Sequence, residues 1–182
     1  MNGESSYSRF LKGDNDALAQ IVEKHNKSLV FYLAGILKSV SLAEDAAADA
    51  FVEIFVKKPR LKTEEAFCAY LYRTARNKAI DELRRQRRRD EQPIEETELA
   101  DSRMLEDEVL KKERDKSLHN AIAKLNPDYR EALHLVYFEN MSYDSAGKVM
   151  GKSLKQVTNL VYRGKEALKK ILEKEGGLYE EQ

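Results

Sequence analysis

Cysteine, proline and glycine are scarce in this 182-residue chain, and tryptophan is absent. The single cysteine, Cys68, lies in an apolar stretch with helical spacing, so an internal disulfide framework and a zinc site built on several cysteines are excluded. We expect Cys68 to be a small buried side chain. With 3 prolines, 8 glycines and no convincing alternation of apolar and polar residues, the sequence favours helices over strands.

Long hydrophobic runs and a targeting signal are also missing. No apolar stretch approaches the roughly 20 residues that span a bilayer, and the first residues lack the charged start and apolar core of a signal peptide. We therefore expect a soluble, cytoplasmic protein without membrane insertion. His25, His119 and His134 are dispersed, and no metal-ligand spacing, nucleophile motif or glycine-rich phosphate loop is found. The sequence predicts no enzyme, no metal site and no cofactor.

The net charge is zero, but the charge is unevenly distributed. Residues 1–90 hold 17 basic and 13 acidic residues, residues 91–113 hold 3 and 9, and residues 114–182 hold 12 and 10. An acidic segment with few large apolar residues thus separates two basic parts, as expected of a linker. We predict an all-α protein of two small helical domains, residues 1–90 and 114–182, joined by the acidic linker 91–113.

Capping residues and helical periodicity delimit the expected helices. In the first domain we expect helices over residues 14–25, 27–39, 41–57 and 63–89, the third opened by a capping box from Ser41 to Glu44. In the second we expect helices over 107–124, 127–138, 142–150 and 153–173. Their boundaries are marked by Asn126–Pro127, by Ser142, by Gly151 in a left-handed turn, and by Ser153.

The stretch SYDSAGKVMGKSLKQVTNLVYRGKEALKK has the pattern of a helix-turn-helix. Advancing about 100° per residue from Val157 places the other apolar positions on one stripe, namely Leu160, Val161, Gly164, Leu168 and Ile171. The opposite face carries amides and cations that can pair with base edges or phosphates. A plain amphipathic hairpin with a solvated face is the alternative.

The stretch FCAYLYRTARNKAIDELRRQRRR holds eight cations between Arg73 and Arg89, against only Asp81 and Glu82. Its apolar positions are expected to form two stripes, the first with Phe67, Tyr70, Leu71 and Thr74, the second with Ala75, Ala79, Ile80 and Leu83. The cations, together with Tyr70 and Tyr72, suit single-stranded DNA with unstacked bases. The alternatives are a solvated charged face and a nuclear-import signal.

These elements, in this order and spacing, resemble the bacterial RNA polymerase sigma factors of the extracytoplasmic-function group over nearly the whole chain. LAEDAAADAFVEIFVK resembles the helix by which sigma region 2 binds the polymerase clamp. The arginine-rich stretch resembles the region 2 helices that open and read the −10 element. LNPDYREALHLVYFENMSYDSAGKVMGKSLKQVTNLVYRGKEALKKIL resembles region 4, which binds the −35 element.

The resemblance implies a factor that directs core RNA polymerase to specific promoters and assists strand opening, with an anti-sigma protein as a candidate third partner. It implies polymerase contacts by Asp45, Asp49, Phe51 and Glu53. It implies −10 contacts by Lys58, Arg60, Lys62, Arg73, Arg76, Asn77, Arg84, Arg85 and Arg88. It implies −35 contacts by Ser153, Lys155, Gln156, Thr158, Asn159, Tyr162 and Arg163. A stand-alone helix-turn-helix regulator is the alternative function, and an adaptor that does not bind DNA is a third.

The chain also departs from the pattern of this family. Phe55 and Tyr70 stand about where family members often carry tryptophan. The recognition helix has Thr158, Asn159 and Leu160 where basic residues or serine are common, so the promoter sequence cannot be transferred. Gly147 stands where alanine is usual, and we expect it to weaken its helix by about 1 kcal/mol.

Overall fold

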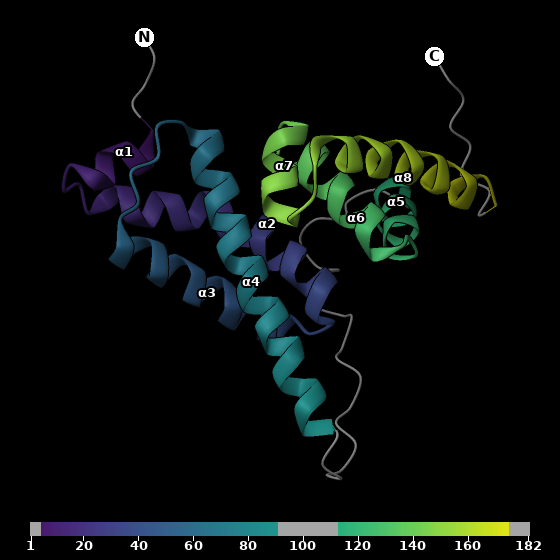
Figure 1. The fold of residues 1–182 in the computed structure, drawn as a ribbon, viewed down its shortest axis with the longest axis horizontal. Coiled ribbons are helices and arrows are strands. Elements are labelled where there is room, and N and C mark those ends of the chain that lie inside the picture. Colours follow the sequence, from purple (N-terminus) through teal and green to yellow (C-terminus); the bar gives the residue numbers. More distant parts are fainter. Residues whose placement is uncertain (1–4, 91–112, 175–182) are drawn as a thin grey trace. The chain divides into compact units, whose positions relative to one another are not determined.

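The computed structural model describes residues 5–90 and 113–174, and within these ranges it contains helices and no strands. The chain divides into two compact units, the first with α1 to α4 and the second with α5 to α8 (Figure 1). The predicted all-α architecture is confirmed. The predicted linker, apart from Glu113, lies outside the described residues, and the domain boundaries stay a prediction.

The first unit consists of α1 (Ser6–Leu11), α2 (Asp16–Leu37), α3 (Val40–Lys57) and α4 (Glu64–Asp90), and α2 packs against each of the other three. The buried side chains of α2 recur at helical spacing along one side, as Ala17, Ile21, His25, Leu29, Tyr32, Leu33 and Leu37. On α3 most of the buried positions are alanines, which leave room for a close approach of the two helices.

Three features of this unit differ from the sequence-based expectations. The helices expected at 14–25 and 27–39 are one continuous helix, because no glycine or proline interrupts the buried series from Ile21 through His25 to Leu29. Helix α3 begins earlier than expected, since the hydroxyl of Ser39, and not that of Ser41, accepts from the backbone N–H of Leu42 at 3.3 Å. The short α1 was not predicted at all.

Helix α4 buries one continuous stripe instead of the two expected. Phe67, Cys68, Leu71, Tyr72, Ala75 and Ala79 are buried, whereas Tyr70 and Thr74 are only half-buried. Tyr72 is fully buried, with its ring 5.1 Å from that of Tyr32 in an edge-on contact. The prediction that Tyr72 offers its ring to a nucleic acid is therefore wrong, because its ring faces α2 inside the core.

The second unit consists of α5 (Glu113–Ala123), α6 (Pro127–Leu133), the π-helical turn η2 (His134–Phe138), α7 (Tyr143–Met150) and α8 (Leu154–Lys174), and α8 packs on α5, α6 and α7. The boundaries predicted at Asn126–Pro127, Ser142 and Gly151 are confirmed, whereas the predicted start of the first helix at residue 107 lies outside the described residues. The side chains of Asn126 and Ser142 accept from backbone N–H groups at 2.9 and 3.2 Å, and Gly151 has φ of 66°.

Gly147 has a structural role that the sequence did not indicate. A Cβ atom at this position would lie 2.6 Å from the backbone carbonyl oxygen of Lys152, which is closer than any real Cβ contact. The backbone N–H of Lys152 in turn donates to the carbonyl of Gly147 at 2.9 Å. Glycine here allows the turn to close against α7, so the expectation that it merely weakens the helix is corrected.

Within the described ranges, none of the helices combines the length and the apolar character that a membrane span requires.

Candidate nucleic-acid interface

A basic loop joins α3 to α4 and begins with a left-handed residue. Lys58 has φ of 44° and ends α3, and Lys58, Arg60 and Lys62 are exposed. The ammonium of Lys58 lies 5.2 Å from the centre of the Phe10 ring, a cation–π contact with α1. The phenol of Tyr7 donates a 2.7 Å hydrogen bond to the backbone carbonyl of Pro59. The loop is thus held against α1 while its cations face solvent.

The predicted cations of α4 are distributed along the outside of the helix. Arg73, Asn77, Arg84, Arg85 and Arg88 are exposed, whereas Arg76 is half-buried and is engaged in an interaction of its own. Arg84 pairs with Asp81 at 3.2 Å and Arg85 with Glu82 at 3.5 Å, both three residues apart on the helix. Such exposed pairs contribute little to stability, so these guanidinium groups can exchange carboxylates for phosphates at small cost.

An open groove of about 410 Å³ lies where α3 meets α4. Its lining is Glu53, Tyr70, Arg73, Thr74, Asn77, Lys78 and Asp81. The carboxylate of Glu53 bridges Lys57 of its own helix at 2.7 Å and Lys78 of α4 at 2.8 Å. These two ammonium groups hold the pKa of Glu53 below its ordinary value. The groove therefore combines a half-buried aromatic side chain with hydrogen-bond donors, which suits an unstacked base.

The outward face of α3 differs from the one expected. Phe51 is buried and stacks on Phe55, with ring centres 6.0 Å apart, so it is not a surface contact and that prediction is wrong. Glu53 serves the two intramolecular ion pairs already described and is only partly exposed. Asp45 and Asp49 are exposed as expected.

Sequence reasoning missed two apolar residues on this face. Val52 and Val56 are 60% and 77% exposed, and with Asp45 and Asp49 they follow helical spacing along one side of α3. We call these four residues the α3 face. The two exposed valines, one helical turn apart, give this side of α3 an apolar patch. The buried alanines of α3 lie on the opposite side of the helix, so the α3 face points away from the core of the first unit.

Helix α8 carries the polar face predicted for the helix-turn-helix. Val157, Val161 and Gly164 are buried, and the predicted contacts Ser153, Lys155, Gln156, Thr158, Asn159, Tyr162 and Arg163 are all exposed. Leu160, Leu168 and Ile171 are only partly buried, whereas Leu172, which was not predicted, is buried.

Three of these exposed side chains, those of Ser153, Gln156 and Thr158, form hydrogen bonds at the start of α8. Ser153 and Gln156 form a reciprocal capping box, in which the Gln156 side chain accepts from the Ser153 N–H at 2.8 Å. The Thr158 hydroxyl donates to the Leu154 carbonyl at 2.9 Å. Lys155, Asn159 and Arg163 are the exposed donors best placed to read bases or phosphates. Leu154, 56% exposed, was not predicted and could contact a thymine methyl.

Each of the two units matches a model of a known protein family. The family model described as sigma-70 region 2 matches residues 21–89, and the model described as sigma-70, region 4 matches residues 115–168. The extracytoplasmic-function RNA polymerase sigma factor SigW of Bacillus subtilis is 30% identical over 171 residues, covering 88% of this chain and 91% of that protein. The RNA polymerase sigma-H factor of Pseudomonas aeruginosa is 28% identical, covering 91% of each chain.

Solved structures share the fold. A structure of CnrH in complex with the cytosolic domain of CnrY matches with a TM-score of 0.63 and 21% identity, covering 92% of this chain and 95% of that one. A structure of the sigma factor RpoE in complex with the anti-sigma factor NepR from Bartonella quintana matches with a TM-score of 0.62 and 20% identity, covering 85% and 96%. No observation favours a stand-alone regulator.

Proposed function

The chain belongs to the extracytoplasmic-function group of the sigma-70 family of RNA polymerase sigma factors, and from that premise we propose how its residues divide the work of initiation. As a sigma factor it directs core polymerase to promoters and takes part in strand opening. We assign the −10 element and core polymerase to the first unit and the −35 element to the second. The chemistry of RNA synthesis stays in the polymerase, and we place the protein with that enzyme in the cytoplasm.

The α3 face is the proposed docking surface for core polymerase. The exposed side chains of Val52 and Val56 supply apolar area, and Asp45 and Asp49 supply charge at the other end of the same face. Burying the two valines supplies affinity, whereas the carboxylates contribute orientation and a fast association rate.

Strand capture is proposed to occur along α4. The cations of the basic loop and the outer side of α4 would follow the phosphates of one separated strand, and the groove beside Tyr70, Arg73 and Asn77 would receive an unstacked base. Unstacking a base costs a few kcal/mol, which contacts in such a groove and ion pairs with phosphates offset.

The second unit is proposed to bind the −35 element as a duplex. The observation that carries this assignment is the exposure of Lys155, Asn159 and Arg163 on α8, opposite its buried stripe. Asparagine can pair in a bidentate manner with adenine, and arginine with guanine. An anti-sigma protein is proposed as a regulatory partner, supported by the two related folds whose solved structures include such a complex or a bound cytosolic domain.

The test is in vitro transcription with core polymerase on promoters that differ only in the spacer between the two elements. Because two connected units must contact two elements at once, activity should fall steeply when the spacer changes by a few base pairs. Equal activity across the series would contradict the assignment of the two elements to two units.

A further inference from the structure

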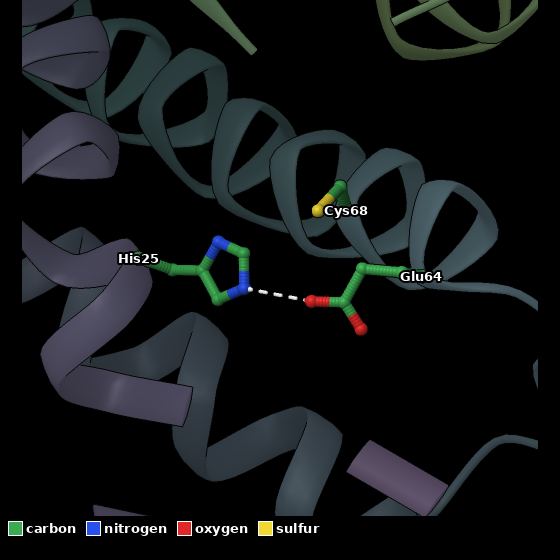
Figure 2. A group of neighbouring side chains, drawn as sticks. All are labelled: His25, Glu64 and Cys68. Carbon is green, nitrogen blue, oxygen red and sulfur yellow. Dashed lines mark ion pairs between the residues drawn. The ribbon is translucent and has the colours of Figure 1, made fainter. Parts of the chain in front are cut away.

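Three side chains with metal-binding atoms converge between α2 and the beginning of α4, apart from the surfaces assigned above. His25 comes from α2, and Glu64 and Cys68 come from successive turns of α4, four residues apart on one side of the helix. One imidazole nitrogen, one carboxylate oxygen and the sulfur all lie within 4.8 Å of one another. Figure 2 shows the imidazole, the carboxylate and the thiol directed toward a common space.

The spacing of these atoms is close to that of ligands on one zinc ion. Two nitrogen or oxygen ligands about 2.1 Å from a tetrahedral zinc lie roughly 3.4 Å apart. The Nε2 atom of His25 lies 3.5 Å from Oε1 of Glu64, the pair joined by the dashed line in Figure 2. That separation is long for a hydrogen bond but suits two atoms that share an ion. Since all three ligand atoms lie within 4.8 Å of one another, shifts of about 1 Å would bring them to the separations found around one zinc ion.

The same carboxylate has a second oxygen whose hydrogen bonding is not satisfied. The Oε2 atom of Glu64 is buried and has no hydrogen-bond partner, although the Glu64 side chain as a whole is 37% exposed. An unpaired buried carboxylate oxygen is costly. Because Oε2 faces away from His25 in Figure 2, a cation would remove that cost only by binding both oxygens of the carboxylate. His25 and Cys68 are themselves buried, so only the Glu64 side of the cluster opens to solvent.

We propose that His25, Glu64 and Cys68 form a binding site for a divalent transition metal, zinc in the first place, with a fourth position open to water. One thiolate, one imidazole and one carboxylate suit zinc and exclude magnesium and calcium, which prefer oxygen ligands alone. Binding requires the thiol of Cys68 to lose its proton to solvent.

Lys24 competes with the metal and so provides an internal control. Its ammonium lies 2.6 Å from Oε1 of Glu64 and is 58% exposed, so it can turn into solvent when a metal takes the carboxylate. Removing this ammonium should therefore tighten metal binding, whereas removing a ligand should weaken it. A purely structural cluster would not give these opposite signs.

A bound ion would join α2 to the first turn of α4, immediately after the basic loop. Thr63 already caps this turn, its hydroxyl accepting from the N–H of Ala66 at 3.1 Å. Metal binding should therefore slow hydrogen exchange at the start of α4 and in α2 around His25, and leave the second unit unchanged.

The decisive experiment uses the full chain with Co²⁺ or Zn²⁺ as the only added ligand. We expect one Co²⁺ to bind per chain and to give a thiolate-to-cobalt charge-transfer band. Adding Zn²⁺ should displace the Co²⁺ and remove this band. Cys68→Ser should abolish the band. Loss of a hydrogen-bond partner of a metal ligand weakens metal binding roughly 10–100-fold, and Glu64→Gln, which removes a ligand itself, should weaken it more. Lys24→Gln should tighten it several-fold, and His119→Gln, outside the cluster, should leave it unchanged.

The variants remain informative if a ligand substitution disturbs folding, because Lys24→Gln alters only an exposed side chain and circular dichroism identifies unfolded samples. Absence of the charge-transfer band in the wild type, equal affinity in the wild type and Cys68→Ser, or weaker binding in Lys24→Gln would each overturn the proposal.

Discussion

The phenol of Tyr7 donates a 2.7 Å hydrogen bond to the backbone carbonyl of Pro59, which is 52 residues further along the chain. Tyr7 also stacks on Phe67 of α4, with ring centres 4.5 Å apart. A short N-terminal helix thus fixes both the basic loop and the helix that follows it. The position of the proposed strand-capturing cations therefore depends on α1.

Replacing Tyr7 by phenylalanine should cost about 1 kcal/mol of unfolding free energy, because the Pro59 carbonyl loses its partner while the ring packing remains. The expected measurement is a lower urea midpoint with an unchanged m-value. Tyr162→Phe is the matched control, since Tyr162 is 68% exposed, and it should leave the midpoint unchanged.

The same residue gives a prediction for alkaline pH. Burial, and then the charge of Tyr70, raises the pKa of Tyr7 from 10.0 to about 12. The unfolded chain then loses this proton at lower pH than the folded one. The contribution of Tyr7 to stability is fully present below pH 10 and is lost as the pH rises to about 12. Stability measured across this window should decline less steeply in Tyr7→Phe than in the wild type; equal slopes would contradict the assignment.

Replacing Val52 and Val56 together by serine should weaken binding to core polymerase by roughly 2 kcal/mol, about thirtyfold in Kd, because the α3 face then offers much less apolar area. Both side chains are exposed in the free protein, so the thermal midpoint should hardly change. Glu23→Lys, an exposed change on α2, is the control for nonspecific effects. Unchanged polymerase affinity in the double serine variant would remove the α3 face from the interface.

Replacing Arg84 and Arg88 by alanine should reduce open-complex formation and flatten its dependence on salt. The logarithmic slope should fall by about 0.7 for each phosphate of a single strand that is no longer neutralised. Permanganate footprinting over a salt series measures both effects. Lys169→Ala with Lys170→Ala removes the same charge from exposed positions of α8 and should leave strand opening unchanged. Normal melting with an unaltered slope in the arginine variant would rule out the role of these two side chains at the phosphates.

Replacing Gly147 by alanine should destabilise the second unit, although alanine is the better helix former. The new Cβ would meet the Lys152 carbonyl oxygen at 2.6 Å, and the strain of such overpacking, about 1–3 kcal/mol, exceeds the roughly 1 kcal/mol gained in helix propensity. Ser145→Ala, at a half-buried position two residues earlier in α7, is the comparison. A higher thermal midpoint for Gly147→Ala would show that the turn relaxes without cost.

The sequence by itself determined the features that depend on neighbours along the chain. Asn126, Ser142, Gly151 and Ser153 were read correctly as helix boundaries, because capping is an interaction between residues two or three positions apart. The outward face of α8 was read correctly for the same reason, since helical spacing fixes which side chains point together. The order of the two DNA-facing segments was likewise sufficient to indicate the family.

Only the tertiary structure decided which side chains are buried against other parts of the fold. Tyr72 faces Tyr32 in the core and Phe51 packs on Phe55, so neither is available to DNA or polymerase, although each lies on a helix of the expected type. The same holds for Gly147, whose lack of a side chain matters only because the Lys152 carbonyl approaches it. His25 lies far from Glu64 and Cys68 in sequence, and their convergence depends on how α2 packs against α4, which no local pattern encodes.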